Sequence, residues 1–209
     1  MKASSLVFLI AVLAVYNLYA QDKFSVQLSG GIITPINSSK GLTGLLQVNY
    51  SISENSTLYA YFSTSSWYHN NILINKDNMH PIEAYDEDRH ILNSFNAGDR
   101  IIFNRNKFFD AFADVELGYI HLNYRKLSLS RYVNSDGTIE YLNDYASSAI
   151  AHESVLGTGI GVGLQHHMID RFDLLLNLKL NTFMNDVING NFTFDRTYLT
   201  YMFGFVYKI

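Results

Sequence analysis

The chain contains no cysteine, only 2 prolines and only 1 tryptophan among its 209 residues. The lack of cysteine excludes disulfide bonds and a cysteine-linked lipid anchor, and it fits a bacterial envelope better than an animal secretion. The scarcity of proline argues against a linker between two domains. No apolar run after residue 20 reaches about 18 residues, the length expected of a transmembrane helix.

Hydrophobic residues make up 48% of the chain and charged residues 16%, which allows one sizeable folded domain. Aromatic residues reach 14%, with 15 tyrosines and 14 phenylalanines, and this enrichment favours β structure. The formal net charge is −4 and becomes about −5 if a segment containing Lys2 is removed. A nucleic-acid partner is therefore not expected.

Residues 1–20 have the layout of a cleavable secretory signal. Lys2 precedes the apolar run from Leu6 to Val15, and the segment ends on Ala20. An uncleaved anchor is the alternative, but the apolar run is short for a spanning helix. We expect cleavage before Gln21 and a single domain over residues 21–209.

Hydrophobic alternation with a period of two recurs along the mature chain and predicts antiparallel strands. The connections between these segments are alternately short and long, so all short turns would lie at one end of the sheet. This pattern predicts an all-β fold, an eight-stranded antiparallel up-and-down transmembrane β-barrel. The predicted strands lie near residues 23–33, 42–52, 57–67, 91–103, 109–124, 152–165, 172–184 and 194–208.

The orientation of the two strand faces separates a membrane barrel from a soluble one. In the segment 172–184, leucines at every second position from Leu174 to Leu180 share one face, while Asn177 and Lys179 share the other. A soluble lipocalin-like barrel buries its apolar face, and a membrane barrel turns it towards lipid. Asparagine, lysine, acids and a row of glycines would make a poor soluble core, so we expect lipid outside. A periplasmic ligand-binding barrel is the alternative if the sheet is reversed.

Aromatic residues recur where the predicted strands end. The last segment, "RTYLTYMFGFVYKI", alternates apolar and aromatic residues up to Ile209. Such rings of aromatic side chains mark the two interfaces of a bilayer. We expect an aromatic girdle of Tyr59, Phe108 and Tyr207 at the short-turn end and Trp67, Tyr68, Tyr119 and Tyr198 near the other end.

A last strand that pairs with the first leaves no open sheet edge in lipid. With this feature, the chain resembles the small eight-stranded outer-membrane barrels of the OmpX type and the membrane domain of the OmpA type, and its start after Ala20 resembles exported proteins of the Bacteroidetes. The resemblance implies an integral outer-membrane protein with extracellular loops and periplasmic termini. Gly204, Tyr207 and Ile209 also resemble the C-terminal signal read by the outer-membrane assembly machinery, although Met202 replaces its usual polar residue.

Charged residues on the inward face predict a buried ion-pair network. Eight strands enclose only enough room for their own side chains, so no wide pore is expected. We predict that Lys179 meets Asp114 or Glu116 across a glycine-rich strand, with Arg100 nearby. If Asp136 and Gly137 form a two-residue hairpin tip that pairs Ser135 with Thr138, the register places Glu116 opposite Gly157, Asp114 opposite Gly159, Phe112 opposite Gly161 and Lys179 beside Gly157 or Gly159.

Asp99 breaks the inward and outward alternation of its strand. Strict alternation aims this carboxylate at lipid, where a charge near the midplane costs up to a few kcal/mol. We therefore expect a β-bulge nearby or a position close to a membrane interface.

The hairpin of residues 125–150 continues to alternate past the predicted membrane boundary at Tyr124. A protruding sheet is expected, which could bind an external protein by strand addition or could simply be solvated. The loop 67–90 contains three histidines in no known ligand spacing, and no metal or cofactor is predicted.

An enzyme is the remaining alternative, because some eight-stranded outer-membrane barrels act on lipid A. His152, Glu153 and Ser154 match the His-x-Ser pair of that deacylase group, but Val155 stands where those enzymes have asparagine. We therefore expect a structural or adhesive surface protein, with no catalytic residues, rather than a lipid A hydrolase.

Overall fold

The computed structural model describes residues 23–36, 38–70, 87–126, 129–143, 149–184 and 197–209. The expected signal sequence of residues 1–20 lies outside these ranges, as does most of the histidine-containing loop. None of the described residues belongs to a helix that is long and apolar enough to cross a membrane.

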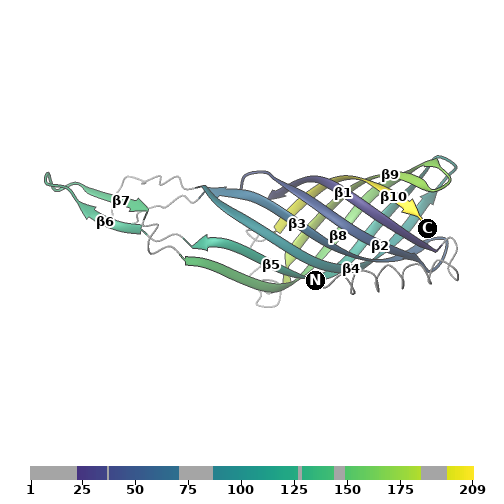
Figure 1. The fold of residues 1–209 in the computed structure, drawn as a ribbon, viewed down its shortest axis with the longest axis horizontal. Helices are drawn as coiled ribbons and strands as arrows, with labels where there is room; N and C mark the ends of the chain where they lie inside the picture. Colours follow the sequence, from purple (N-terminus) through teal and green to yellow (C-terminus); the bar gives the residue numbers. More distant parts are fainter. Residues whose placement is uncertain (1–22, 37, 71–86, 127–128, 144–148, 185–196) are drawn as a thin grey trace, which may run out of the picture.

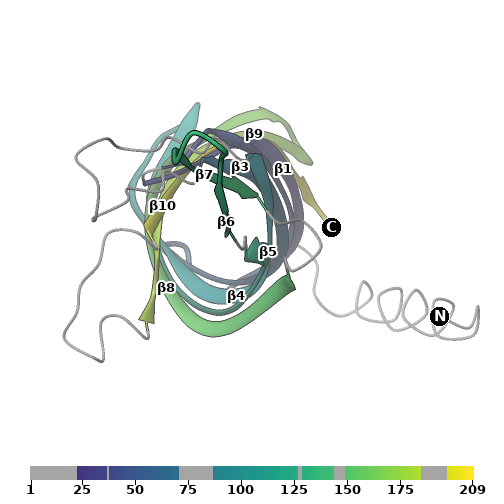
Figure 2. The same ribbon diagram turned by 90° about the vertical axis from the view of Figure 1, so that its left-hand side faces the viewer.

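Eight antiparallel strands form a closed barrel in the order β1-β10-β9-β8-β5-β4-β3-β2 (Figures 1 and 2). Neighbouring strands are consecutive along the chain except where the small hairpin β6–β7 intervenes and where β1 meets β10 to close the barrel, which confirms the predicted up-and-down barrel. The barrel strands are β1 (Phe24–Pro35), β2 (Gly41–Ser51), β3 (Ser56–Asn70), β4 (Glu87–Arg105), β5 (Phe109–Lys126), β8 (Ala149–Ile169), β9 (Phe172–Phe183) and β10 (Thr197–Lys208).

The barrel closes between its first and last strands. β1 pairs with β10 from Ser25 opposite Lys208 to Pro35 opposite Tyr198. Every barrel strand thus has a neighbour on both sides, and the sheet has no open edge.

Short and long connections separate the two ends of the barrel. Residues 52–55, 106–108 and 170–171 join consecutive strands at one end, which we call the short-turn end. In one of these turns, Asn106 Oδ1 accepts hydrogen bonds from the backbone N–H groups of Phe108 and Phe109 at 2.9 and 3.0 Å. This local bonding favours a tight turn. The opposite end is the long-loop end.

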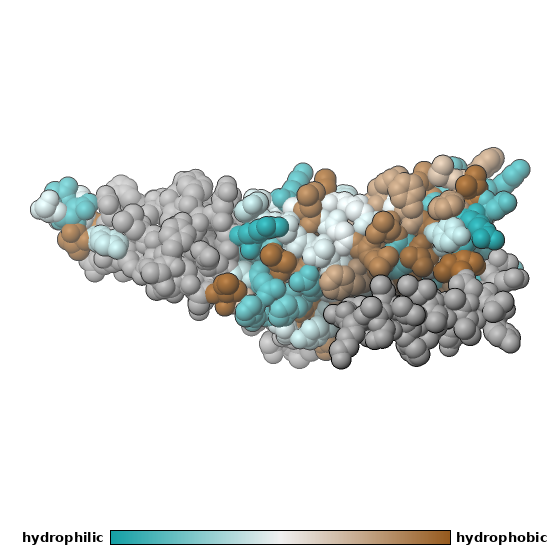
Figure 3. All heavy atoms as spheres, in the orientation of Figure 1, coloured by the Kyte–Doolittle hydropathy of each residue, from teal (hydrophilic) through white to brown (hydrophobic). Residues whose placement is uncertain are grey.

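The apolar face of the barrel strands points outward and the polar face points inward. Ten outward side chains that are 52% to 73% exposed are Leu28, Leu42, Leu46, Phe62, Phe95, Leu117, Ile160, Val162, Leu176 and Phe205. In Figure 3, brown, hydrophobic surface gathers on the right-hand part of the barrel wall. Buried polar residues facing the interior include Gln27, Gln47, Asn49, Ser63, Ser65, Ser94, Asn96, Asn177, Asn181 and Thr200.

The interior is not uniformly polar, because an apolar layer crosses it at the long-loop end. We call this layer the apolar ring. Seven of the eight barrel strands contribute one buried side chain each, and the eighth, β2, supplies Gly41. A Cβ atom on Gly41 would overlap the Ser66 carbonyl oxygen and would lie 2.6 Å from Trp67 Cβ, so only a glycine allows β2 and β3 to approach this closely beside Trp67. The ring consists of Ile33, Trp67, Leu92, Ile120, Val155, Phe183 and Tyr198.

The aromatic girdle was predicted wrongly at three positions. Trp67 and Tyr198 belong to the apolar ring, and Tyr59, which is 4% exposed, also faces the interior. Each shares its strand face with buried residues, so the alternation of the strand overrides the aromatic preference for an interface. The outward and exposed members of the expected girdle are Tyr68, Phe108, Tyr119 and Tyr207.

A separate two-stranded sheet, β6 (Leu129–Val133) and β7 (Ile139–Asn143), lies beyond the long-loop end of the barrel (Figure 1). The predicted two-residue tip was wrong. Asn134, not Ser135, faces Thr138, and its N–H donates to the Thr138 carbonyl at 2.8 Å. Gly137 has a φ of +82°, which suits a three-residue loop closed by a left-handed glycine.

Candidate functional site in the barrel interior

Four charged side chains from three strands meet in the middle of the barrel. Lys179 Nζ of β9 lies 2.5 Å from Glu116 Oε2 and 3.7 Å from Asp114 Oδ2, both on β5. Arg100 of β4 donates to the Asp114 carboxylate through Nε at 2.9 Å and Nη2 at 3.2 Å. The structure thus brings together the four residues expected to form an ion-pair network, each at most 3% exposed.

Neutral side chains supply the remaining hydrogen bonds to the two carboxylates. Tyr59 donates to Glu116 at 2.9 Å, and Tyr61 also donates to Glu116. Asn177 donates to Asp114 at 2.8 Å. A buried charge is tolerated when it is both paired and hydrogen-bonded, and each acid here satisfies both conditions.

Aromatic rings cover the two cations of the network. The Arg100 guanidinium carbon lies 3.8 Å from the centroid of the Phe112 ring. Lys179 Nζ lies 4.5 Å from the centroid of Tyr61 and 4.8 Å from that of Tyr59. These distances allow cation–π attraction, which strengthens where the cation is removed from water.

Glycines on β8 make space for the network. β8 runs between β5 and β9, so a side chain there would stand between the acids and the lysine. A Cβ atom at Gly161 would lie 2.8 Å from Lys179 Cγ, and one at Gly159 would lie 2.9 Å from Glu116 Cγ. The absence of side chains allows β5 and β9 residues to meet across the intervening strand.

The predicted register between β5 and β8 was wrong by two residues. Glu116 pairs with Gly159 rather than Gly157, and Asp114 pairs with Gly161. Lys179 likewise pairs with Gly161. The error arises because the register of the β6–β7 hairpin does not continue into the barrel: Val133 pairs with Ile139 in the hairpin, whereas Lys126 pairs with Ala149 in the barrel. The observed partners of the two acids and of the lysine are all shifted along the same row of glycines on β8. The predicted contact between the acids and the lysine is therefore present.

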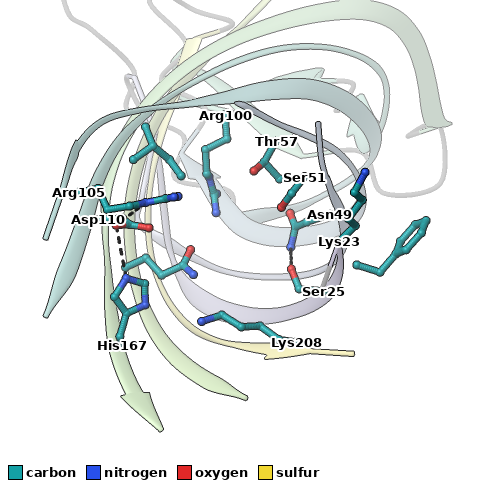
Figure 4. Close-up of a pocket in the computed structure, with 13 residues that line it drawn as sticks. Lys23, Ser25, Asn49, Ser51, Thr57, Arg100, Arg105, Asp110, His167 and Lys208 are labelled. Atoms are coloured by element: carbon teal, nitrogen blue, oxygen red, sulfur yellow. Dashed lines mark hydrogen bonds and ion pairs between the residues drawn. The ribbon is translucent and has the colours of Figure 1, made fainter. Parts of the chain in front are cut away.

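A polar cavity of about 410 Å³ lies between this network and the short-turn end of the barrel (Figure 4). Arg100 points into it from the network side, and Lys23, Arg105 and Lys208 lie around it. The full lining is Lys23, Phe24, Ser25, Asn49, Ser51, Thr57, Arg100, Ile102, Arg105, Asp110, Gln165, His167 and Lys208.

One side of this cavity is a chain of contacts that joins charged side chains through the imidazole of His167. Asp110 Oδ1 lies 3.3 Å from Arg105 Nε and 3.4 Å from His167 Nε2, and Figure 4 shows these groups together. His167 Nδ1 lies 3.3 Å from Asp173 Oδ1, and the other oxygen of Asp173 lies 2.8 Å from Lys208 Nζ. Two buried acids, Asp110 and Asp173, thereby hold the basic side chains at the open, short-turn end of the cavity in place.

Asp99 lies close to the short-turn end on the outward face of β4. It pairs with Leu58 and Val115, which are both exposed outward, and Ser56 donates to its Oδ1 at 2.9 Å. A register shift follows between Ile102 and Asn104. Asp99 therefore sits where a hydroxyl and the end of the barrel relieve the cost of its charge.

The His-x-Ser pair lies on the outer wall near the long-loop end. Ser154 Oγ is 2.8 Å from His121 Nδ1 on the neighbouring strand, while His152 Nδ1 contacts Asn123 Oδ1. The ring centroids of His121 and His152 are 5.9 Å apart, with the planes inclined by 8°. The histidine bonded to Ser154 is thus His121 of the neighbouring strand, which a pattern within one strand cannot indicate.

Sequence reasoning missed the neutral partners of the network and the cavity beneath it. Tyr61 and Asn177 share strand faces with predicted lumenal residues, so alternation alone could have placed them inside. Arg105 and Asp110, by contrast, flank a turn and belong to a site only because β8 and β10 end beside them. No local pattern signals such a cavity.

No family model and no curated protein matches the chain. Similar solved structures include Neisserial surface protein A, with a TM-score of 0.58, 12% identity and coverage of 89% of this chain and 97% of that chain. A major outer membrane protein from Thermus thermophilus has a TM-score of 0.51 and 10% identity, with coverage of 88% of this chain and 98% of that chain. Ail, the attachment invasion locus protein of Yersinia pestis, in complex with sucrose octasulfate has a TM-score of 0.50 and 10% identity, with coverage of 88% of this chain and 96% of that chain. At these identities the likeness shows a shared fold.

Proposed function

We propose that the chain is an integral outer-membrane protein with a closed interior, which displays its β6–β7 hairpin outside the cell for contact with external proteins. The observation that carries this proposal is the orientation of the barrel faces. Large apolar side chains cover the outside, while charged and amide side chains fill the inside. In water this arrangement would expose a continuous apolar surface, whereas a bilayer solvates it.

The closed sheet supports the same conclusion. Hydrocarbon offers no hydrogen bonds to backbone groups, so a strand can cross it only in a barrel without an open edge. The pairing of β1 with β10 meets this requirement. A soluble lipocalin-like barrel would need the opposite orientation of faces, and it is therefore disfavoured. The resemblance of Gly204, Tyr207 and Ile209 to the assembly signal fits delivery by the outer-membrane assembly machinery.

The hairpin is the segment best placed for external contact. β6 and β7 form a sheet of two strands beyond the barrel, so each has one edge without a neighbouring strand in the described structure. Tyr132 and Val133 near its tip are 51% and 65% exposed. Exposed edges with apolar and aromatic side chains favour recognition by strand addition. The name of Ail records attachment, and the shared fold is compatible with a similar role here.

Fractionation of cells that express the protein tests the membrane proposal, and surface proteolysis tests its orientation. We expect the protein to be recovered in the outer-membrane fraction. Protease added to intact cells should cleave it between residues 125 and 150. A variant with a protease site in the short turn 106–108 serves as control and should be cut only after the membrane is opened. Recovery in the soluble periplasmic fraction would contradict the proposal.

Binding to outside partners needs a second comparison. Cells displaying the intact chain should bind proteins of the external medium more strongly than cells displaying a chain in which residues 129–143 are replaced by a short Gly-Ser loop. Because β6 and β7 make no barrel pairings, the barrel should fold in both. Equal binding by the two would mean that the hairpin is only solvated.

Hydrolysis of outer-leaflet lipid is a second candidate function, favoured by the 2.8 Å contact between Ser154 Oγ and His121 Nδ1. A serine hydrogen-bonded to an imidazole is the minimum arrangement for an activated nucleophile. If it acts, Ser154→Ala and His121→Ala should each abolish release of fatty acid from lipid A by the purified protein, while His152→Ala should retain some release. No release by the wild-type protein would remove this candidate.

A further inference from the structure

The two arginines of the cavity at the short-turn end have an excess of N–H donors over the side-chain acceptors that they bond among the described residues. Arg100 uses two of its three nitrogens in bonds to Asp114. Arg105 uses only Nε, towards Asp110, within the described part of the chain. A guanidinium carries five N–H donors, so both arginines retain donors that can be directed at a ligand.

The lysines add to this excess. Lys208 makes one ion pair, with Asp173, and the salt bridges between described residues include none for Lys23. The side chains of Arg105 and Lys208 are 45% and 40% exposed, so an incoming group can reach them. Four permanent cations line the cavity. Arg100, Arg105 and Lys208 each pair with one buried carboxylate, so the salt bridges between described residues leave the charge of Lys23 unbalanced.

The position and size of the cavity suit a small organic molecule. Its volume of about 410 Å³ falls in the range of roughly 300 to 1,000 Å³ seen for ligand pockets. Ser51 and Thr57 provide hydroxyl groups on the wall, and the buried Arg100 forms the inner limit. The apolar ring closes the far end of the interior, so a ligand would enter from the short-turn end.

From these features we propose that the cavity binds a small oxyanion, namely a molecule carrying a carboxylate or a phosphate group, from the short-turn side. Arginine recognises both groups through paired N–H donors, and lysine adds a mobile point charge. Arg100 contacts the inner end of the anion, and Lys23, Arg105 and Lys208 contact its outer end. This site is separate from the hairpin and does not depend on the proposed surface role.

Isothermal titration of the folded, full-length protein in a non-ionic detergent at low salt tests the proposal. The two probes are inorganic phosphate and citrate, which separate the phosphate source from the carboxylate source. We expect saturable binding of at least one probe. The double variant Lys23→Gln/Arg105→Gln should weaken it at least about tenfold, because it removes two cations that the geometry places on the ligand.

A matched control distinguishes a built site from general attraction by positive charge. Lys107→Gln/Arg171→Gln removes the same charge from two exposed residues in short turns at the same end, neither of which lines the cavity. Repeated at 0.15 M salt, where the Debye length is only about 8 Å, binding by this control should stay within about twofold of the wild type, because neither side chain lines the cavity and salt screens exposed charges. Absence of saturable binding for both probes, or an equal loss in both double variants, would overturn the proposal.

Discussion

The two ends of the barrel interior are built from opposite kinds of side chain. Towards the long loops, seven strands contribute apolar residues to a ring whose members are at most 7% exposed. Towards the short turns, residues in and beside the strand ends contribute lysine, arginine, aspartate and hydroxyl groups around a cavity. One end is therefore packed like a protein core, and the other is open to polar molecules.

This difference shows that strand alternation alone does not determine the character of a barrel interior. Alternation decides only which residues face inward. Whether a given level of the interior is sealed or hydrated depends on which side chains meet across it, as when Gly41 lets β2 approach β3 closely beside Trp67. The charged network of Arg100, Asp114, Glu116 and Lys179 separates the two levels.

Truncation of the apolar ring should have the largest effect. Ile120 and Phe183 are 1% and 3% exposed, and replacing both by alanine leaves a cavity in the packed end. We expect the free energy of unfolding in lipid bilayers to fall by about 5 kcal/mol or more. Urea unfolding followed by Trp67 fluorescence measures it. The outward variant Leu117→Ala is the control, and a loss as large as that of the ring variant would contradict the packed-end description.

Removal of the central cation should come next. Lys179→Met leaves Glu116 and Asp114 with one positive partner between them, and the loss of one member of a buried pair costs about 3–5 kcal/mol. Unfolding in urea should show this decrease, and the further change Glu116→Gln should recover part of it. If the double variant is no more stable than Lys179→Met, the network does not balance charge in this way.

Removal of a positive charge at the open, short-turn end of the cavity should change the free energy of unfolding very little. Arg105 pairs with Asp110 at 3.3 Å, but its side chain is 45% exposed, and such pairs contribute at most about 1 kcal/mol. Arg105→Gln should therefore leave the urea midpoint almost unchanged. A decrease comparable to that of Lys179→Met would show that the short-turn end is packed as rigidly as the ring.

The hairpin tip extends the comparison beyond the ring and should show the smallest effect. Hydrogen bonds from the Thr138 hydroxyl and backbone N–H lower the pKa of Asp136, which lies in the exposed tip. A lowered pKa means that the turn is stabilised above the pKa of the unfolded chain and loses this stabilisation as pH falls through the folded value. Amide NMR of Thr138 should report the loss at acidic pH, and Asp136→Asn should remove the dependence. A signal independent of pH in the wild type would contradict it.

Much of this architecture was predictable because each barrel strand obeys one simple alternation. Lys179, Asp114 and Glu116 lie on the polar faces of their strands, so the alternation of each strand predicts that all three face the interior. The small glycines on the strand between them predict that their side chains can come into contact. The prediction tolerated a register error of two residues, since a shift of two keeps every side chain on the same face.

The aromatic residues show where such reasoning failed. Trp67 lies on the same face as Ser63 and Ser65, and Tyr198 on the same face as Thr200, so parity contradicted their assignment to an interface. Aromatic residue type alone does not distinguish a membrane-interface position from the apolar ring, whereas strand face does. The cavity was not predictable at all, because its lining comes from strand ends whose meeting depends on the closed register.

The seam between β1 and β10 also constrains the order of events in folding. Ser25 and Lys208 stand opposite each other although almost the whole mature chain separates them. Contacts of such long sequence separation carry a large loop-closure cost and form slowly. β10 must be synthesised before β1 can lose its free edge, so the growing chain is exposed to aggregation at this edge until then. The topology of the barrel therefore requires that the free edge of β1 be protected until the barrel closes.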